Sequence, residues 1–341
     1  MEPHPDSDIL IVGAGVAGAA TAFHLRRRGI GPVRILEREA LPGVHSSGRS
    51  AAIVREHADH ATEQRLLSAG ADALRRGELA EFEPRGVMLL GLGEDDAAAR
   101  FPGARGLGRW APRDGTVDVA GLLATYLDGQ DVRYETRLLA WEAHDAYVSV
   151  STSAGDMRCR ILVNAAGSWA GELFDLPLTP TNRHLFFTPP LDWVDPRWPC
   201  VWSGQDGLYF RPESGGLMLC ACDESRAAPG DYREDPRVLE TLAEKLSRLQ
   251  PGLGELSIRA SWVGQRTFAP DRGFVIGFDP RWPRVFHVAG LGGHGVTASY
   301  AVGGLAAARI AGERPAGAEV FDPARLLDEG SLGASRRAHG S

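Results

Sequence analysis

The fold is decided near the N-terminus by the segment DILIVGAGVAG, residues 8–18. Residues 8–12 form a short apolar run typical of a buried strand, and residues 16–28 are rich in Ala and Leu, which favour a helix. Gly29 is the expected end of that helix, and residues 33–36 form a second β-type run. The whole unit has the length of one strand–helix–strand mononucleotide-binding fold, about 30 residues. The sequence therefore predicts an α/β fold that begins with a parallel sheet.

Three glycines in this segment, Gly13, Gly15 and Gly18, predict a binding site for the pyrophosphate of a dinucleotide. The first permits a tight turn, the second lets the backbone approach the phosphates, and the third lets the helix pack closely on the strand. The N-terminus of the helix adds free N–H groups and a positive dipole end. Glu37, at the end of the second strand, is placed to bind ribose hydroxyls, which disfavours a 2′-phosphate. NAD and FAD share this pattern, so the choice between them depends on other segments.

A second candidate phosphate-binding segment is GVHSSGRSAA, residues 43–52. It offers several backbone amides, the hydroxyl groups of Ser46 and Ser47, and the guanidinium group of Arg49 at an expected helix start. A dinucleotide that extends this far beyond the first turn is expected to be FAD. An NAD-only dehydrogenase stays compatible with the first motif alone.

The composition is that of a globular protein, with 43% hydrophobic and 24% charged residues among 341. A net charge of -7 provides no basic surface for nucleic acid or an anionic membrane. No apolar run reaches the roughly 18 residues of a membrane span, and residues 9–12 lack the flanks of a signal peptide. The four cysteines show neither a CxxC pair nor metal-ligand spacing, so we expect free thiols, no metal and a cytoplasmic location.

The pattern changes along the chain and predicts two discontinuous domains. Strands are expected at residues 87–92, 132–136, 147–152 and 161–165, a loop leading into a helix at 46–67, and a helix at 116–127. Residues 176–267 are rich in proline and aromatic residues, with paired strands at 204–222 and a helix at 236–249. A strand, a glycine turn and a helix follow at 285–310. We predict a nucleotide-binding domain of residues 1–85, 111–175 and 265–325, a β-rich substrate domain of residues 86–110 and 176–264, and a disordered tail at 326–341.

Five motifs in the same order resemble the D-amino-acid oxidase and dehydrogenase family of flavoproteins. They lie at residues 13–18, 37–39, 42–52, 163–167 and 290–295. The bacterial D-arginine dehydrogenase type is the most similar branch, and glycine and sarcosine oxidases are more distant. The resemblance implies a Rossmann-like, glutathione-reductase-type FAD-binding domain with an inserted antiparallel β-rich substrate domain.

The resemblance also implies the cofactor contacts. The residues expected at FAD are Gly13, Gly15, Val16, Ala17, Gly18, Glu37, Arg38, Ser46, Ser47, Gly48, Arg49, Ser50, Ala51, Ala52, Ile53, Leu138, Ala166, Gly167, Gly292, Gly293, His294, Gly295, Val296 and Thr297. The last six are expected at the isoalloxazine ring, where N–H groups and a helix N-terminus would stabilise the anionic reduced flavin. Gly264 stands about where sarcosine oxidases carry the cysteine that binds flavin covalently, so we expect non-covalent FAD.

Two arginines match family positions for binding the substrate carboxylate, Arg266 and Arg183. Arginine suits this role because its planar group donates two parallel hydrogen bonds. Tyr209 is expected to donate its O–H beside Arg266, while His294 and His184 are candidates either for holding a proton or for a packing role. The expected reaction is oxidation of the Cα–N bond of a D- or N-alkyl amino acid by hydride transfer to flavin N5. The product is an imine, which hydrolyses to a 2-oxo acid.

Departures from the family pattern refine this prediction. Val87 and Ile53 stand where the D-arginine dehydrogenase type has an acidic residue and a histidine, which predicts an apolar or small substrate side chain. Residues 90–110 form a shorter segment than in the family, so we expect a less covered pocket that admits a bulky or carrier-tethered amino acid. The only lysine, Lys245, falls in an expected surface helix, which favours an external acceptor such as a quinone over O2.

Two other functions remain open from the sequence alone. One is an FAD-dependent 2-hydroxy-acid dehydrogenase that keeps the arginine pair. The other is a non-catalytic flavin-binding protein, suggested by the departures at Ile53 and in residues 90–110.

Overall fold

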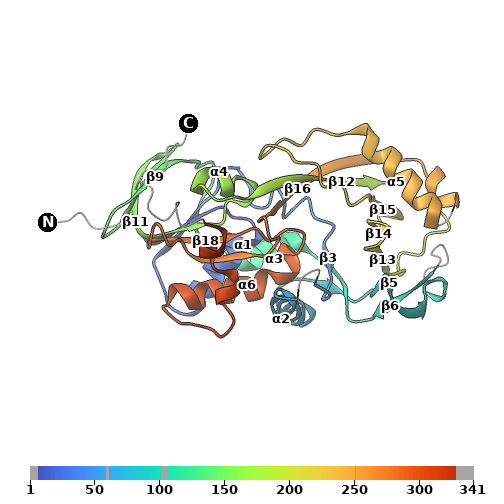
Figure 1. Cartoon of the computed structure of the whole chain (residues 1–341), viewed down its shortest axis with the longest axis horizontal. Coiled ribbons are helices and arrows are strands. Elements are labelled where there is room, and N and C mark those ends of the chain that lie inside the picture. The colour runs from blue at the N-terminus through green and yellow to red at the C-terminus, as the bar shows by residue number, and fades with distance from the viewer. Residues whose placement is uncertain (1–6, 59–60, 101–105, 250, 328–341) are drawn as a thin grey trace.

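The computed structural model describes residues 7–58, 61–100, 106–249 and 251–327. An eight-stranded sheet and its helices occupy the left and centre of Figure 1, and a seven-stranded sheet occupies the right. The strands of the eight-stranded sheet are β1 (Ser7–Val12), β2 (Val33–Leu36), β8 (Asp131–Arg133), β9 (Leu138–Ala143), β10 (Val148–Thr152), β11 (Gly155–Asn164), β17 (Val275–Phe278) and β18 (Val285–Ala289).

The centre of this sheet is parallel, as the sequence predicts. β1 lies between β2 and β11, and the order along the main path is β17-β18-β11-β1-β2-β8. The pairs β2–β8 and β11–β18 are also parallel, whereas β17 joins β18 in antiparallel fashion. β9, β10 and β11 form an antiparallel extension.

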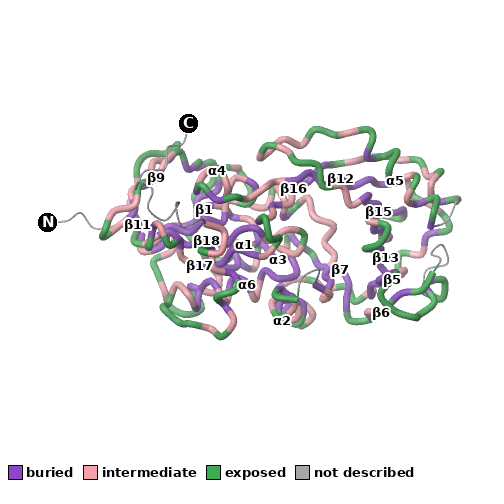
Figure 2. Tube along the Cα trace, viewed as in Figure 1, coloured by how far each residue is buried: buried purple, intermediate pink, exposed green. Residues whose placement is uncertain are grey.

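Helices pack against this sheet and against each other: α1 (Val16–Arg27), α2 (Gln64–Arg75), α3 (Val119–Leu127), α4 (Ala170–Phe174) and α6 (Gly295–Ile310). The central core joins Ile9 and Ile11 of β1 to Leu25 of α1 and Val302 of α6. All four residues are buried. Figure 2 shows buried stretches of the trace at α1 and α6. α1 and α6 cross so closely that a Cβ on Gly303 would lie 2.6 Å from the carbonyl of Ala20.

One predicted helix is too long in the sequence analysis. The helix expected at residues 116–127 begins at Val119, because the side chain of Asp118 accepts a hydrogen bond from Ala120 N at 3.0 Å and caps it. The residues before the cap form β7 (Gly115–Val117), which pairs with β3 (Ile53–Val54) and β4 (Phe82–Glu83). β3 lies in the segment that we expected to be a loop.

The seven-stranded sheet has the order β16-β12-β15-β14-β13-β5-β6. Its strands are β5 (Val87–Asp96), β6 (Leu107–Ala111), β12 (Thr179–Phe187), β13 (Cys200–Ser203), β14 (Leu208–Glu213), β15 (Gly216–Cys220) and β16 (Ala260–Phe268). β14 and β15 confirm the predicted pair of antiparallel strands, and α5 (Pro236–Leu249) has the predicted bounds. β5 and β6 join this sheet through β13, although they lie far from it in the sequence.

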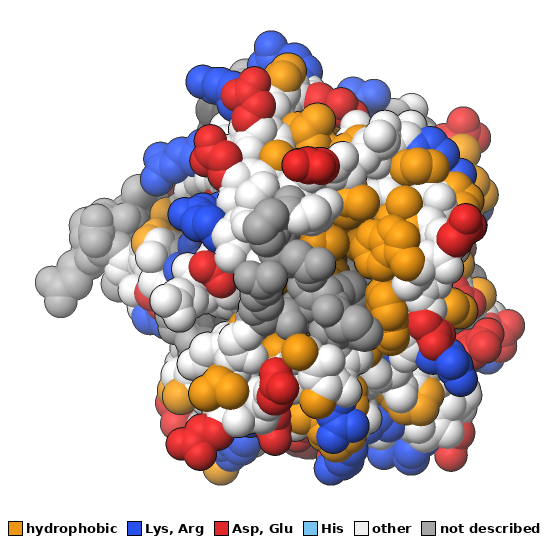
Figure 3. All heavy atoms as spheres, turned by 90° about the vertical axis from the view of Figure 1, so that its right-hand side faces the viewer, with side chains coloured by type: hydrophobic (Ala, Val, Ile, Leu, Met, Phe, Trp, Pro, Cys, Tyr) orange, Lys and Arg blue, Asp and Glu red, His pale blue; other side chains and the backbone are white. Residues whose placement is uncertain are grey.

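α5 covers this sheet through Leu242 and Leu246, which pack with Phe210 and Leu219. Lys245 of α5 donates hydrogen bonds to the carbonyl groups of Gly207 (2.8 Å) and Ala221 (2.7 Å). Figure 3 shows hydrophobic side chains gathered on the surface at this end of the molecule.

The predicted disordered tail falls outside the described residues except for Leu326 and Leu327. Among the described residues, no helix combines the length and the apolar character needed to cross a membrane. We retain the predicted division into two domains as a proposal.

Candidate functional site

The glycine turn after β1 opens into a pocket suited to the adenosine end of a dinucleotide. Gly13 has φ +107°, and a Cβ there would lie 2.5 Å from Ala165 O, so the turn requires glycine. Glu37 is only 6% exposed, and its carboxylate accepts hydrogen bonds from Ala14 N (2.9 Å) and Glu39 N (3.0 Å). These bonds fix an acidic group beside the turn, as a ribose-binding residue requires.

Several predicted cofactor residues line this pocket: Gly13, Gly15, Glu37, Arg38, Ser46, Ser47, Leu138, Ala166 and Gly167. Gly18 and Gly48 are absent from its lining and have packing roles instead. A Cβ on Gly18 would overlap Gly13 O, and Gly48 N donates to Gly43 O at 2.7 Å. Both glycines therefore stabilise the conformation of the two predicted phosphate-binding segments without lining the pocket.

Aromatic residues that the sequence analysis missed complete this pocket and its rim. Trp169 lines the pocket, and the guanidinium carbon of Arg38 lies 4.4 Å from the centre of its ring. His45 contacts Glu39 at 2.9 Å and the hydroxyl of Tyr232 at 2.6 Å. Tyr232 comes from a distant loop, so only the tertiary structure shows this contact.

A second cavity continues from the first, and the two share Gly15, Ser46, Ser47, Ala165 and Gly167. The N-terminal residues of α1 and α6 both line it, so the positive ends of two helix dipoles face the same space. The predicted residues in its lining are Gly15, Val16, Ala17, Ser46, Ser47, Arg49, Ser50, Ala51, Ala52, Ile53, Gly167, Arg183, Tyr209, Arg266, Gly292, Gly293, His294, Gly295, Val296 and Thr297. The two cavities therefore meet at the glycine turn and at residues 43–52.

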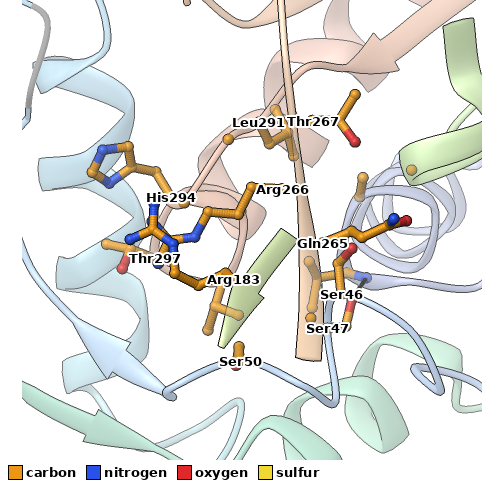
Figure 4. A pocket seen from close by; sticks show the side chains of 18 of the residues that line it. Ser46, Ser47, Ser50, Arg183, Gln265, Arg266, Thr267, Leu291, His294 and Thr297 are labelled. Atoms are coloured by element: carbon orange, nitrogen blue, oxygen red, sulfur yellow. Dashed lines mark hydrogen bonds between the residues drawn. The ribbon is translucent and has the colours of Figure 1, made fainter. Parts of the chain in front are cut away.

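The register of β12 and β16 brings the two predicted arginines together. Arg183 is opposite Gly264, and Arg266 is opposite Thr181, so the arginines are diagonal neighbours on one face of the sheet. Both side chains project into the cavity in Figure 4. A Cβ on Gly264 would lie 3.0 Å from the carbonyl oxygen of Arg49, so glycine here lets residues 43–52 pass close to β16.

Arg266 lies over the turn that precedes α6. Its Nη2 is 3.5 Å from the hydroxyl of Tyr209, and its Nη1 would be 2.9 Å from a Cβ on Gly293. The guanidinium group is half-buried. This arrangement places a planar pair of donors beside the residues expected at the flavin ring.

Arg183 is more deeply buried, at 5% exposure, and has an acidic neighbour that the sequence analysis missed. Its Nη2 donates to Glu224 at 2.8 Å, and Glu224 also accepts two hydrogen bonds from Arg272, both at 3.0 Å. The buried Nε of Arg183 has no hydrogen-bond partner in the described structure. Glu224 and Arg272 lie in loops without a motif, so no sequence pattern indicated this cluster.

One wall of the cavity is aromatic. The rings of Tyr209 and Trp202 are stacked with centroids 4.5 Å apart, and the guanidinium carbon of Arg55 lies 4.3 Å from the centre of the Trp202 ring. Ile53 lines the cavity as predicted, but Val87 does not: it is fully buried and packs with Leu89 and Cys200 behind the wall.

The two candidate histidines differ in position. His294 precedes α6 and lines the cavity. His184 is absent from the lining; its Nδ1 contacts Asp223 at 2.7 Å, and its Nε2 accepts a hydrogen bond from Asp235 N at 3.0 Å. His184 therefore holds the loop before α5, and its packing role is the better supported one.

The charges of Arg183 and Arg266 affect the pKa values of Tyr209 and Cys220. Burial raises the pKa of Tyr209 well above its usual value, with a further increase from the charge of Cys220. Burial alone would raise the pKa of the Cys220 thiol, but a hydrogen bond with Cys222 and the charges of Arg183 and Arg266 lower it to about 6. This end of the site is strongly cationic.

Comparisons with known proteins agree with this geometry. The family model described as FAD dependent oxidoreductase matches residues 8–309. Among curated proteins, the chain is similar to glycine oxidase of Bacillus licheniformis, with 23% identity over 89% of this chain and 93% of that protein. It is also similar to D-amino-acid oxidase of Rubrobacter xylanophilus, with 28% identity over 88% of this chain and 94% of that protein.

Other relatives are longer. The match to FAD-dependent oxidoreductase domain-containing protein 1 of Bos taurus is 26% identical and spans 47% of this chain but only 38% of that protein. Among solved structures, L-proline dehydrogenase from P. horikoshii has a TM-score of 0.83 and 21% identity, covering 95% of this chain and 98% of that one. At this identity the likeness shows the shared fold alone.

Proposed function

The chain belongs to the family of FAD-dependent oxidoreductases, and on that premise we propose that it oxidises the Cα–N bond of a D- or N-alkyl amino acid. Bound FAD supplies a two-electron acceptor for the hydride that leaves Cα, while the amine loses a proton and becomes an imine. Water then hydrolyses the imine to a 2-oxo acid and releases ammonia, or the alkylamine if the substrate was N-alkylated. The observation that carries the proposal is the position of Arg266, over Gly293 and beside Tyr209, in a cavity continuous with the dinucleotide pocket.

The residues of the site would act mainly by positioning. Arg266 would bind the α-carboxylate with two parallel hydrogen bonds, which fixes the orientation of Cα. Tyr209 would donate a third hydrogen bond, since its raised pKa keeps the hydroxyl protonated. The neutral amine provides the electron pair for the step, so the reaction needs no strong base from the chain.

A cationic substrate side chain is disfavoured. The carboxylate that contacts Arg183, Glu224, already accepts hydrogen bonds from two guanidinium groups, those of Arg183 and Arg272. The other acidic residue of the described cavity lining, Glu63, is buried. We therefore propose that D-Arg and D-Lys are poor substrates. A higher kcat/KM for D-Arg or D-Lys than for D-Leu, D-Phe and D-Ala would contradict this.

We propose that FAD is bound non-covalently and that a quinone, rather than O2, reoxidises it. The sole lysine, Lys245 of α5, donates hydrogen bonds to the carbonyl groups of Gly207 and Ala221. Neither this lysine nor any of the four cysteines appears in the described linings of the two cavities. Acid precipitation should release free flavin. Turnover with an artificial quinone should exceed turnover in air.

The main experiment is anaerobic mixing of the yellow protein, which should absorb near 450 nm, with matched acids. The panel contains D-, L- and N-methyl amino acids and the corresponding 2-hydroxy acids. Bleaching of the flavin by D- or N-methyl amino acids is the expected result. Bleaching by hydroxy acids alone would replace the proposal with a hydroxy-acid dehydrogenase, and no bleaching at all would favour a non-catalytic flavoprotein.

The prediction of an open pocket for a bulky or carrier-tethered substrate remains a proposal. None of the described residues 90–100 and 106–110 lines either cavity, while residues 101–105 lie outside the described part of the chain. Turnover of an N-methyl amino acid linked to a soluble carrier, compared with the free acid, would test it.

A further inference from the structure

We propose that the amine oxidised in this site carries a second carboxylate, bound by Arg183, so that the substrate is an amino- or iminodicarboxylic acid with a short spacer. The inference rests on the proposed function, because it assigns the α-carboxylate to Arg266. It names the class of substrate that the described residues fit best.

The first argument is charge. Arg183, Arg266 and Arg272 line the cavity together with Glu224, which accepts hydrogen bonds from Arg183 and Arg272. The other acidic residue in the described lining is Glu63. Asp223, next to Glu224, lies outside that lining and is engaged by His184, through both its backbone N–H and its ring. With Arg49 and Arg55, five arginines and two acidic residues belong to the described lining, so one substrate carboxylate would still leave an excess of positive charge. A buried charge is costly unless it is paired and hydrogen-bonded.

The second argument is the hydrogen bonding of Arg183. Its Nη2 shares Glu224 with Arg272, which binds both carboxylate oxygens of that residue. The Nε of Arg183 is buried and has no partner among the described residues. A guanidinium group can donate five hydrogen bonds, so Arg183 retains unused donors on a side chain that is 94% shielded from solvent. A second ligand carboxylate would use such donors.

The third argument is the distance between the two arginines. Because they are diagonal neighbours on one sheet face, the two residues are expected to be roughly 7–8 Å apart, with their Cβ atoms somewhat closer. Both long side chains project into one cavity (Figure 4), so a small molecule can reach both guanidinium groups at once. This geometry favours two carboxylates joined by a short chain. The lowered pKa of the Cys220 thiol, which both arginines help to lower, agrees with an excess of positive charge here.

This inference departs from the sequence-based prediction of an apolar or small side chain. That prediction depended on the missing acidic residue at Val87 and on Ile53, which exclude a cation but say nothing of an anion. Val87 proves to lie behind the cavity wall, whereas Arg183 lies on the wall itself.

The first test compares matched substrates on the wild-type holoenzyme. D-Aspartate is compared with D-alanine, and N-(carboxymethyl)glycine with N-methylglycine, by flavin reduction and by steady-state turnover. We expect kcat/KM to be at least tenfold higher for one or both dicarboxylates than for the matched monocarboxylate. Equal or lower values for both dicarboxylates would overturn the inference.

The second test uses Arg183→Met, which keeps an apolar stem of similar length. The ratio of kcat/KM for a dicarboxylate to that for its matched monocarboxylate should fall at least tenfold. In the control Arg197→Met, which removes an exposed surface arginine paired with Asp195, the ratio should stay as in the wild type. An unchanged ratio in Arg183→Met would show that Arg183 assists in binding the single α-carboxylate and would overturn the inference.

A binding measurement separates the inference from the proposed function. Succinate and butyrate are titrated into oxidised holoenzyme, and binding is followed by the flavin spectrum. We expect succinate to bind more tightly than butyrate, and we expect Arg183→Met to abolish this difference. If the difference is found but no amino acid bleaches the flavin, the proposed function is wrong and the second carboxylate site is supported. If amino acids bleach the flavin but succinate binds no more tightly than butyrate, the function stands and the second carboxylate site does not.

Discussion

At Arg266 the guanidinium group is held between the Tyr209 hydroxyl and the backbone of Gly293. A carboxylate bound here would gain a bidentate, charge-assisted interaction in a partly buried place, where such a pair is stronger than at the surface. Arg183 and Arg266 could be selected from the sequence because each lies in a motif-like segment. Glu224, Arg272 and Arg55 could not be selected, since their approach to the cavity depends on loops and strands that are distant in the sequence.

We predict that Arg266→Met lowers kcat/KM for every amino acid substrate by roughly 100-fold or more, because removing one partner of a buried charge pair costs about 2–5 kcal/mol. Steady-state kinetics would measure the loss, and flavin content would serve as the folding control. Arg266→Lys should recover part of the activity, since the charge returns without the planar pair of donors. A variant Arg266→Met with wild-type KM and kcat would remove Arg266 from the carboxylate site.

Among the elements, α1 is the one for which we predict effects on both cofactor binding and acid sensitivity. The helix packs on β1 and α6 through small residues, and its N-terminus opens on the cavity. Its start, its end and the strands around it were predictable because glycine turns and apolar runs are local signals. The start of α3 and the strands β3 and β9 were missed. A side-chain cap sets the start of α3, and pairing with neighbouring strands forms the two short strands, so the apolar pattern of the sequence does not indicate them.

We predict that Gly18→Ala weakens both FAD binding and folding. The added methyl group would overlap Gly13 O, a backbone atom that cannot move without opening the phosphate turn. Overpacking of this kind costs about 1–3 kcal/mol. Chemical denaturation and FAD titration would measure the two effects.

Gly204→Ala is the matched control, because a Cβ at Gly204 meets nothing within 4 Å. It should retain wild-type stability and flavin content. If Gly18→Ala behaves like this control, the close packing of α1 on the turn is not needed for the cofactor.

We predict that His24 of α1 makes the fold sensitive to acid. Burial, and then the charge of Arg27, lower the pKa of His24 from 6.5 to about 4, and its ring lies edge-on to Tyr300 of α6 with centroids 4.5 Å apart. The unfolded chain binds a proton near pH 6.5 that the folded chain refuses until about pH 4. The contribution of His24 to the free energy of unfolding should therefore be fully present above pH 6.5. It should be lost as the pH falls from 6.5 to 4. Its slope should be at most about 1.4 kcal/mol per pH unit, reduced by the partial exposure of the ring.

His24→Phe should flatten this slope, as measured by denaturation at a series of pH values. Some acid sensitivity should persist, because burial lowers the pKa of His287 too. The control His144→Phe, in the hairpin of β9 and β10, should keep the wild-type slope. A slope unchanged by His24→Phe would show that the ring can be protonated in the folded state at little cost.

On the scale of the whole molecule, the joined cavities collect residues from both large sheets and from the loops between them. β12 and β16 belong to the seven-stranded sheet, whereas Gly13 and Glu37 follow strands of the eight-stranded one. The sequence predicted many of the residues that line the two cavities, whereas the division into two domains stays a prediction. The sequence could not show that residues 86–110 and 176–264 share one sheet, because the parallel pairing of β5 with β13 leaves no local pattern.

We predict that FAD stabilises the entire fold. A ligand that binds only the folded state contributes about 2.7 kcal/mol when its free concentration is 100 times Kd. The Tm of flavin-free protein should rise with added FAD, as followed by calorimetry. FMN, which lacks the adenosine that the pocket at Glu37 is expected to bind, should raise Tm less; equal shifts for FMN and FAD would contradict the assignment of that pocket.

The register between β12 and β16 has a practical consequence for enzyme redesign. Both arginines that we propose to bind carboxylates lie on this one hydrogen-bonded ladder, whereas Trp202 and Tyr209 of the aromatic wall belong to β13 and β14. A mutant library restricted to the aromatic wall can therefore vary the accepted substrate skeleton while leaving the ladder intact. An insertion of a single residue within either strand of the ladder would turn one arginine to the opposite face, so such length changes should be the most damaging class in any screen.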